Sequence, residues 1–316
     1  MPPSVSIVIP VYNGASTLGP LVARLVGTYG ETWDLEIILV NDGSVDDSRS
    51  VCCDLVAKHP GVVRFLQLSR NFGEHAAVLA GLRRTSGDAV VVMDDDFQNP
   101  PEEVGALVEA LRQGDHDVVY ARFEGKAYSW WRRLGSGFND RVANILIQKP
   151  KGLYLSSFKC MNRFVVGEVC RYEGPYPYLD GLILRVTRDL GLVLCERKER
   201  AEGESGYTLR KLTSLWLNMF TNFSILPLRA AVVVGFAFAA IAGVLSIGVV
   251  IEKLLIPETQ VGWASLSILV MLFAGIQLMV LGVIGEYLGR QFLSVNGTPQ
   301  STVREEHGFN ASPEIP

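Results

Sequence analysis

Three consecutive aspartates end an apolar run in the stretch AVVVMDDDFQNPPEEV, residues 89–104. Adjacent carboxylates repel one another, so such a turn requires a cation or good solvation. In an extended chain Asp94 and Asp96 lie on one side and Asp95 on the other. Carboxylate oxygens suit Mg²⁺ or Mn²⁺, which fill their remaining coordination positions with water and substrate phosphates. The alternative is a solvated acidic turn that caps a helix over 101–113, because prolines and acids favour a first helical turn.

Polar segments follow other apolar runs as well. They are PVYNG at 10–14, NDGSVDDS at 41–48 and SRNFGEHAAVLAGL at 69–82. Runs rich in Val and Ile lie at 5–9, 36–40, 62–68, 89–93 and 118–121. Between them lie amphipathic segments at 15–29, 46–58, 74–85 and 101–113. This alternation predicts an α/β fold, with a mostly parallel sheet that binds ligands at the carboxyl ends of its strands. No G-x-G-x-x-G follows the first run, which argues against a hydride-transferring enzyme.

Composition restricts the class of protein further. The 316-residue chain has a net charge of −4, which gives no indication of a nucleic-acid partner. Its five cysteines are scattered, without a Cys-x-x-Cys pair, which favours a reduced, cytosol-facing catalytic part. The first residues, MPPSVSIVIP, contain no basic segment and no long apolar segment, so we expect no signal peptide.

Two long stretches, 230–251 and 261–285, contain no charged residue. Each exceeds the roughly 20 residues that span a bilayer, so together they predict a transmembrane helical hairpin. The alternative is a pair of helices buried in a large core. Basic residues near the outer ends of the two stretches favour cytoplasmic termini. Residues 208–226 place apolar side chains at helical spacing, which predicts a helix lying in the membrane interface.

The ordered set of motifs resembles a known family. VSIVIPVYNG, LVNDGSVDDS and MDDDFQNPPEE together resemble the GT-A (Rossmann-like) glycosyltransferases of the dolichol-phosphate mannose synthase type. The stretch AEGESGYTLRKLTSLWLNMFTNFSILPLR, the two apolar stretches and GEYLGRQF are similar to bacterial undecaprenyl-phosphate glucosyltransferases and aminoarabinose transferases. The resemblance extends from about residue 4 to residue 293. It implies an inverting transfer of one sugar from a nucleotide sugar to a polyprenyl phosphate.

The resemblance implies roles for residues in the donor site. Asp94 and Asp96 would bracket the donor diphosphate, and with Gln98 they would hold Mg²⁺ or Mn²⁺. Asp42 would accept a hydrogen bond from the nucleotide base. The other nucleotide-sugar contacts that it implies are Pro10, Val11, Tyr12, Asp95 and Arg200.

Two positions depart from the pattern of the family. Gly14 stands where the family often has Glu, and Gly206 replaces the lysine of GESKY. A missing ammonium near the diphosphate would weaken donor binding unless a neighbour such as Arg210 takes its place.

The segment ARFEGKAYSWWRRLGSGFNDR combines basic residues with two tryptophans. Arginine forks bind phosphate and tryptophan settles at the membrane surface, so the segment suits an anionic lipid head group. In the resembling family, an arginine after the fifth strand and an arginine and a serine on the next helix hold the lipid phosphate. Here these are Arg122, Arg132 and Ser136, and Arg133 fits the spacing equally. The alternative is an ordinary basic helix face.

A phosphate monoester is ionised near neutral pH, so its oxygen can attack without a strong general base. Asp180, in PYPYLDGLI, stands where many related transferases keep a base; the alternative is that it caps a helix. His75, in the segment 69–82, could approach the donor or have a structural role.

The expected organisation has four parts. They are a catalytic domain at 1–207, an interfacial helix at 208–228, the transmembrane hairpin at 229–290 and a partly disordered cytosolic tail at 291–316. We expect a multi-pass protein of the inner (cytoplasmic) membrane, with its catalytic domain and both termini cytoplasmic, in contact with membrane lipid. A homo-oligomer is left open.

Three functional alternatives remain open. The resemblance of the C-terminal half to the bacterial UDP-dependent members implies a UDP-sugar donor and a role in cell-envelope glycan modification, while a GDP-mannose-dependent enzyme is the alternative. A processive synthase would show a Q-x-x-R-W motif and more spans, which the sequence lacks. From another class, the chain could be a non-catalytic membrane scaffold that binds nucleotide sugars.

Overall fold

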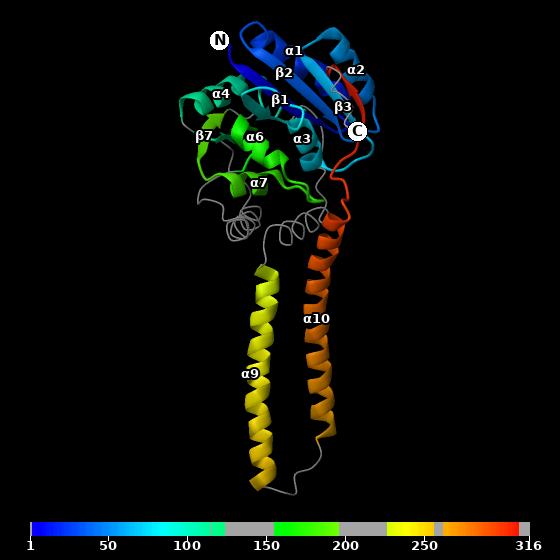
Figure 1. Cartoon of the computed structure of the whole chain (residues 1–316), viewed down its shortest axis with the longest axis vertical. Helices are drawn as coiled ribbons and strands as arrows, with labels where there is room; N and C mark the ends of the chain where they lie inside the picture. Colours follow the sequence, from blue (N-terminus) through cyan, green and yellow to red (C-terminus); the bar gives the residue numbers. More distant parts are fainter. Residues whose placement is uncertain (1, 115, 124–154, 196–225, 256–261, 310–316) are drawn as a thin grey trace. The chain divides into compact units, whose positions relative to one another are not determined.

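The computed structural model describes residues 2–114, 116–123, 155–195, 226–255 and 262–309. Contacts divide the chain into two compact units, one of residues 1–207 with 297–316 and the other of residues 208–296. The first is an α/β unit and the second contains two long helices (Figure 1). The unit that was predicted to end at residue 207 therefore also contains the C-terminal end of the chain.

An eight-stranded sheet, in the order β7-β5-β6-β4-β1-β2-β3-β8, forms the centre of the α/β unit. Its strands are β1 (Ser4–Val11), β2 (Asp34–Asn41), β3 (Val63–Leu68), β4 (Ala89–Val92), β5 (Val118–Phe123), β6 (Lys159–Asn162), β7 (Leu190–Cys195) and β8 (Val303–His307). β1 pairs in parallel with β2 and β4, β2 with β3, and β5 with β7. β6 runs antiparallel between β4 and β5, and β8 runs antiparallel to β3. The mostly parallel sheet is thus confirmed, and its first five strands fall on the predicted apolar runs.

Helices cover both faces of the sheet, as parallel strands with helical crossovers require (Figure 1). α1 (Ala15–Tyr29), α2 (Ser48–Lys58) and α4 (Val104–Gln113, after the short helix η1, Pro101–Glu103) share one apolar core with the strands. Leu18, Leu21 and Leu25 lie on one stripe of α1 and are fully buried in that core. The other face carries α3 (Glu74–Leu82), α6 (Arg163–Cys170) and α7 (Leu179–Val186), which contact one another in that order.

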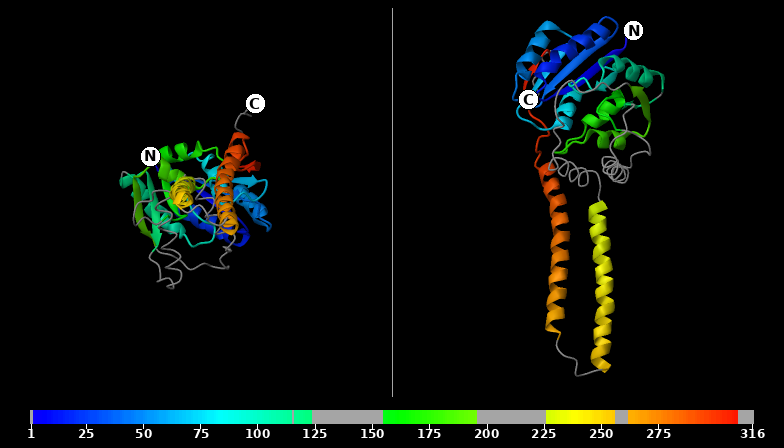
Figure 2. Two further views of the ribbon diagram at one scale, coloured as in Figure 1. Left: turned by 90° about the horizontal axis from the view of Figure 1, so that it is seen from below. Right: turned by 180° about the vertical axis from the view of Figure 1, so that it is seen from behind.

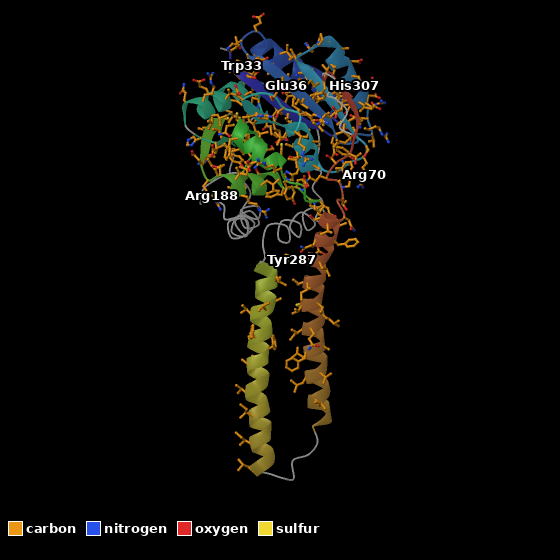
Figure 3. The ribbon with its side chains drawn as sticks, viewed as in Figure 1. Trp33, Glu36, Arg70, Arg188, Tyr287 and His307 are labelled. Atoms are coloured by element: carbon orange, nitrogen blue, oxygen red, sulfur yellow. The ribbon has the colours of Figure 1, made fainter. Side chains whose placement is uncertain are left out.

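The C-terminal strand β8 lies at the edge of the sheet beside β3 (Figure 2). Arg49 of α2 binds both carboxylate oxygens of Glu305, at 2.8 and 2.7 Å from Nη2. His307, labelled in Figure 3, stacks on Phe65 with 5.7 Å between ring centroids. The backbone N–H of Ser69 donates to the carbonyl of Thr302 at 2.8 Å. The sequence predicts a partly disordered tail from residue 291, whereas residues 303–307 are an ordered part of the sheet.

The second unit contains α9 (Leu226–Leu255) and α10 (Trp263–Val295), which fall on the two predicted spans. α10 continues past residue 285, where the prediction ended it. Among the described residues, one stretch, Leu272–Val295, is long and apolar enough to cross a membrane, with a mean hydropathy of 1.6. The transmembrane hairpin therefore stays a proposal. Most of the predicted interfacial helix, residues 208–225, lies outside the described residues.

Removing residues 298–316 deletes β8 and should destabilise the α/β unit. Each backbone hydrogen bond of a strand pair contributes about 1 kcal/mol, so we expect the thermal midpoint to fall by more than about 5 °C. Removing only residues 310–316 leaves β8 in place and is the matched control. Thermal unfolding of both variants in detergent checks this, and equal midpoints would show that β8 does not support the unit.

Candidate active site

Four polar segments meet at one edge of the sheet, because β3, β2, β1 and β4 are adjacent and parallel. The chain leaves these strands at Tyr12, Asp42, Ser69 and Met93. Parallel α/β sheets bind ligands at this edge. The four predicted strand ends thus lie at the same edge of the sheet, and the crevice between them stays a prediction.

Asp42 fixes the loop that follows β3. Its Oδ1 accepts the backbone N–H of Phe72 at 2.7 Å, and its Oδ2 accepts that of Gly73 at 2.8 Å. Gly73 has a φ of 96°, a conformation that favours glycine. Burial raises the pKa of the Asp42 carboxyl, while the two N–H groups act in the opposite direction. The contact with the nucleotide base stays a prediction, and the structure adds a second role, which is to shape residues 70–73.

The end of β1 presents one aromatic side chain. Tyr12 is 53% exposed, so its ring is accessible to a ligand, and Pro10 is half-buried. Val11, in contrast, is 0% exposed and belongs to the apolar core. The side chain of Val11 thus points into the core, as alternate residues of β1 do, and the contact of Val11 with the nucleoside stays a prediction.

Hydrogen bonds hold two of the three aspartates of the acidic turn, Asp94–Asp96. Asp94 Oδ2 accepts bonds from Ser157 Oγ at 2.5 Å and Asn99 Nδ2 at 3.2 Å. Asp96 Oδ1 accepts the backbone N–H of Gln98 at 3.1 Å, and its Oδ2 accepts the Gln98 amide at 2.7 Å. The helix that follows begins after Pro100 without a side-chain cap. The alternative of a solvated acidic turn before this helix stays open, since Glu102 and Glu103 do stand in its first turn.

Asp95 lacks a partner for one of its oxygens. Burial, followed by the charges of Asp94 and Asp96, raises the pKa of the Asp95 carboxyl to about 7. Within the described structure, its buried Oδ2 has no hydrogen-bond partner. A Cβ atom added at Gly14 would lie 2.1 Å from this oxygen. The carboxylate of Asp95 thus occupies the space that a side chain at residue 14 would need, which gives a structural meaning to the departure noted at Gly14.

The acidic turn fits a divalent cation held jointly with a diphosphate. Burial raises the pKa of the Asp94 carboxyl, the hydrogen bond from Ser157 acts in the opposite direction, and the charge of Asp96 raises the pKa further. Mg²⁺ and Mn²⁺ bind one or two carboxylates and complete their shell with phosphate oxygens and water. In the part of the chain that the structure describes, no three His, Cys, Asp or Glu side chains converge as a ready metal site. Asp94, Asp96 and Gln98 stay the predicted metal contacts, with substrate oxygens completing the shell.

Asp180 stands at the start of α7 and is 7% exposed. It does not cap that helix; its Oδ1 binds the ammonium of Lys159 and accepts a hydrogen bond from Tyr120 OH at 3.0 Å. Sequence reasoning missed Lys159. The available signal was a lysine inside the short run FKCM, where a buried strand would normally carry no charge.

Two residues at the start of α3, Glu74 and His75, lie near Asp180 and Lys159. Burial lowers the pKa of His75 to about 4, and its ring packs edge-on against Tyr178 with 5.0 Å between centroids. His75 is therefore neutral and has a packing role. Glu74 keeps accessible surface, yet burial of its carboxyl and then the charge of Asp94 raise its pKa to about 7. Glu74 was not predicted as a site residue.

Among the predicted acceptor residues, the structure describes Arg122, which is exposed at the carboxyl end of β5. Arg132, Arg133 and Ser136 lie outside the described residues, as does the predicted donor contact Arg200. Their roles stay predictions.

The α/β unit has a GT-A-like fold. The chain is similar to the crystal structure of glucosyl-3-phosphoglycerate synthase from Mycobacterium tuberculosis in complex with Mn²⁺, UDP and glucosyl-3-phosphoglycerate. The two are 20% identical with a TM-score of 0.52, and the match covers 69% of this chain and 78% of the synthase. At this identity the likeness establishes the fold and not the substrate.

Sequence comparison establishes the family. Residues 6–168 match glycosyl transferase family 2. An undecaprenyl-phosphate 4-deoxy-4-formamido-L-arabinose transferase from Aeromonas hydrophila is 33% identical over 311 residues, covering 95% of this chain and 93% of that protein. An uncharacterized glycosyltransferase from Bacillus subtilis is 32% identical over 306 residues, covering 96% and 94%. The chain belongs to glycosyl transferase family 2.

Gly14→Ala should weaken nucleotide binding, because the added Cβ displaces the Asp95 carboxylate. The backbone itself tolerates alanine, since Gly14 has a φ of −107°. Losing one hydrogen bond to a charged group corresponds to about a tenfold loss in UDP affinity. Gly19→Ala on the same helix is the matched control, because nothing lies within 4 Å of its added Cβ.

Calorimetric titration of both variants with UDP and Mn²⁺ provides the measurement. Wild-type affinity in Gly14→Ala would mean that the position of the Asp95 carboxylate is irrelevant to donor binding.

Proposed function

We propose that this glycosyltransferase moves a single sugar from a nucleotide sugar, with UDP-sugar favoured, to undecaprenyl phosphate. The observation that carries the proposal is the acidic turn 94–98, which lies at the ligand-binding edge of the sheet next to Tyr12 and the Asp42-held loop. The relative from Aeromonas hydrophila, whose name gives undecaprenyl phosphate as its acceptor, matches over 95% of this chain. The product would be a lipid-phosphate-linked sugar used in cell-envelope glycan modification.

The donor is held by its nucleoside and by its diphosphate. Tyr12 offers an exposed ring to the nucleoside, and Asp95, which follows the end of β4, is a further predicted contact of the nucleotide sugar. Asp94, Asp96 and Gln98 would hold Mg²⁺ or Mn²⁺ against the diphosphate. When bound, the ion neutralises the charge that develops on the leaving diphosphate.

The acceptor supplies its own nucleophile. An ionised phosphate oxygen attacks the anomeric carbon in line, the bond from that carbon to the diphosphate oxygen breaks, and the nucleoside diphosphate leaves with inversion. Arg122 at the end of β5 would bind the lipid phosphate together with Arg132, Arg133 and Ser136. The chemistry needs no strong base, which agrees with an Asp180 carboxylate whose Oδ1 already receives two donors.

Strand β8 supports the proposed membrane topology. β8 follows α10 in the chain and pairs with β3, so the chain must return to the side of the membrane on which β3 lies. If α10 crosses the bilayer, α9 must cross it as well. This supports a hairpin with the catalytic domain and both termini on one side, and the basic residues near the outer ends of the two helices favour the cytoplasmic side of the inner membrane.

Asp96→Asn should lower sugar transfer by at least about 100-fold, because metal-ion stabilisation of the leaving group is worth several kcal/mol. Chelation with EDTA should have the same effect on the wild type, and Mn²⁺ or Mg²⁺ should restore it. Asp88→Asn is the matched control, since Asp88 is an exposed aspartate just before the amino end of β4.

The assay follows labelled sugar from a panel of UDP- and GDP-sugars into a mild-acid-labile lipid. An active Asp96→Asn protein would refute the metal assignment. Transfer from GDP-mannose alone would show that the protein is the alternative, a GDP-mannose-dependent enzyme. If the wild-type protein binds nucleotide sugars but transfers none of them, it is a non-catalytic scaffold.

Arg122→Ala should impair acceptor use and leave donor binding intact. One charged hydrogen bond is worth roughly 1.5–3 kcal/mol, so kcat/KM for undecaprenyl phosphate should fall about ten- to a hundredfold. Arg112→Ala is the control, because Arg112 is an exposed arginine on α4, before β5 begins. Steady-state kinetics and UDP calorimetry measure the two effects. A parallel loss of UDP affinity would place Arg122 on the donor side, and no loss would return it to an ordinary basic surface.

A further inference from the structure

Lys159 is a buried cation at the active-site end of the sheet. It begins β6, opposite Val92 of β4 and Tyr120 of β5. Its side chain is 2% exposed, and among the described residues no other lysine or arginine is buried. Burying an ammonium is costly unless carboxylates compensate it, so its partners indicate its role.

The ammonium of Lys159 binds one particular oxygen of Asp180. Nζ contacts Oδ1, and Tyr120 OH donates to the same Oδ1 at 3.0 Å. The ammonium also lies 5.2 Å from the centre of the Tyr120 ring, a distance at which a cation is attracted to the ring face. Among the described residues, no group donates to Oδ2 of Asp180. Two donors thus fix one oxygen of the carboxylate and leave the other for a ligand.

Other carboxylates surround this pair. The charges of Asp94, Lys159 and Asp180 all act on Glu74, and Lys159 also acts on Asp94. The pair therefore lies within the same group of acids as the acidic turn, close to where the donor diphosphate and sugar would bind. A carboxylate in this position can serve either as a proton acceptor or as a fixed hydrogen-bond acceptor.

We propose that Lys159 is a positioning residue that holds Asp180 Oδ1, so that Oδ2 accepts a hydrogen bond from the donor sugar and Asp180 is kept from acting as a base. The inference rests on the proposed function and narrows the class of acceptor that this function would use. A site whose carboxylate is held in this way favours an acceptor that arrives as an oxyanion, such as a phosphate monoester. A neutral hydroxyl would need a base to remove its proton.

A purely structural role makes a different prediction. If the ion pair only anchors α7 to the sheet, then replacing both charges together should restore stability and activity alike. Three proteins separate the two roles: Lys159→Met, Lys159→Arg and the double variant Lys159→Met/Asp180→Asn. Each is measured for thermal midpoint, UDP affinity with Mn²⁺, transfer to undecaprenyl phosphate, and hydrolysis of the donor by water.

We expect kcat for transfer to fall about 100-fold in Lys159→Met while UDP affinity stays within about twofold of wild type. Lys159→Arg should recover part of kcat, since it restores a cation. The double variant should regain the wild-type midpoint without regaining kcat. Recovery of both midpoint and kcat in the double variant would overturn the proposal, and so would a loss of UDP affinity as large as the loss of kcat.

Donor hydrolysis gives a readout that does not depend on the lipid acceptor. In Lys159→Met the released Asp180 can take a proton from water, whose oxygen then bonds to the anomeric carbon as the diphosphate leaves. The rate of hydrolysis should rise at least about tenfold over wild type. If the wild type fails to use undecaprenyl phosphate, the proposed acceptor is wrong, but the hydrolysis rate of Lys159→Met still tests the role of Lys159. An unchanged hydrolysis rate in Lys159→Met would contradict the proposed positioning role.

Discussion

Carboxylates from three elements crowd the ligand-binding end of the sheet, and among the described residues one buried ammonium faces them. Glu74 begins α3, Asp94 follows β4, and Asp180 begins α7, with Lys159 among them. Burial, and after it the charges of the neighbouring carboxylates, raise the pKa values of Glu74 and Asp95 to about 7. A divalent cation bound with a diphosphate would relieve this repulsion. The charge imbalance therefore links the fold to the chemistry of glycosyl transfer.

The sheet topology creates this arrangement. Parallel strands β2, β1 and β4 bring the nucleoside side and the acidic turn to one edge. The antiparallel strand β6 is inserted between β4 and β5, and this insertion places Lys159 beside Val92 and Tyr120. Strand β8, which follows α10 in the chain, is an outer strand of the sheet and pairs with β3. Strand β3 in turn leads directly into the loop that Asp42 holds. Both ends of the helical unit are thus connected to the domain that carries the site.

The parts that the sequence predicted are those with a repeated local signal. Val- and Ile-rich runs alternating with amphipathic segments identified the first five strands, and the acids at their ends identified the acidic turn. β8 was missed because VREEH is mostly charged; it is stabilised by pairing and by Arg49–Glu305, which no local pattern reveals. The partners of Asp180 and the close approach of Asp95 to Gly14 depend on contacts between distant segments, so neither could be read from spacing.

The dependence of metal binding on the nucleotide tests this account most directly. Paramagnetic resonance of Mn²⁺ can be followed during titration of the purified protein, with and without UDP. Because the described acids offer no ready set of three ligands, we predict weak Mn²⁺ binding to the protein alone and one tightly bound ion per chain once UDP is added. Stoichiometric Mn²⁺ binding without UDP, or UDP binding that EDTA does not weaken, would contradict the account.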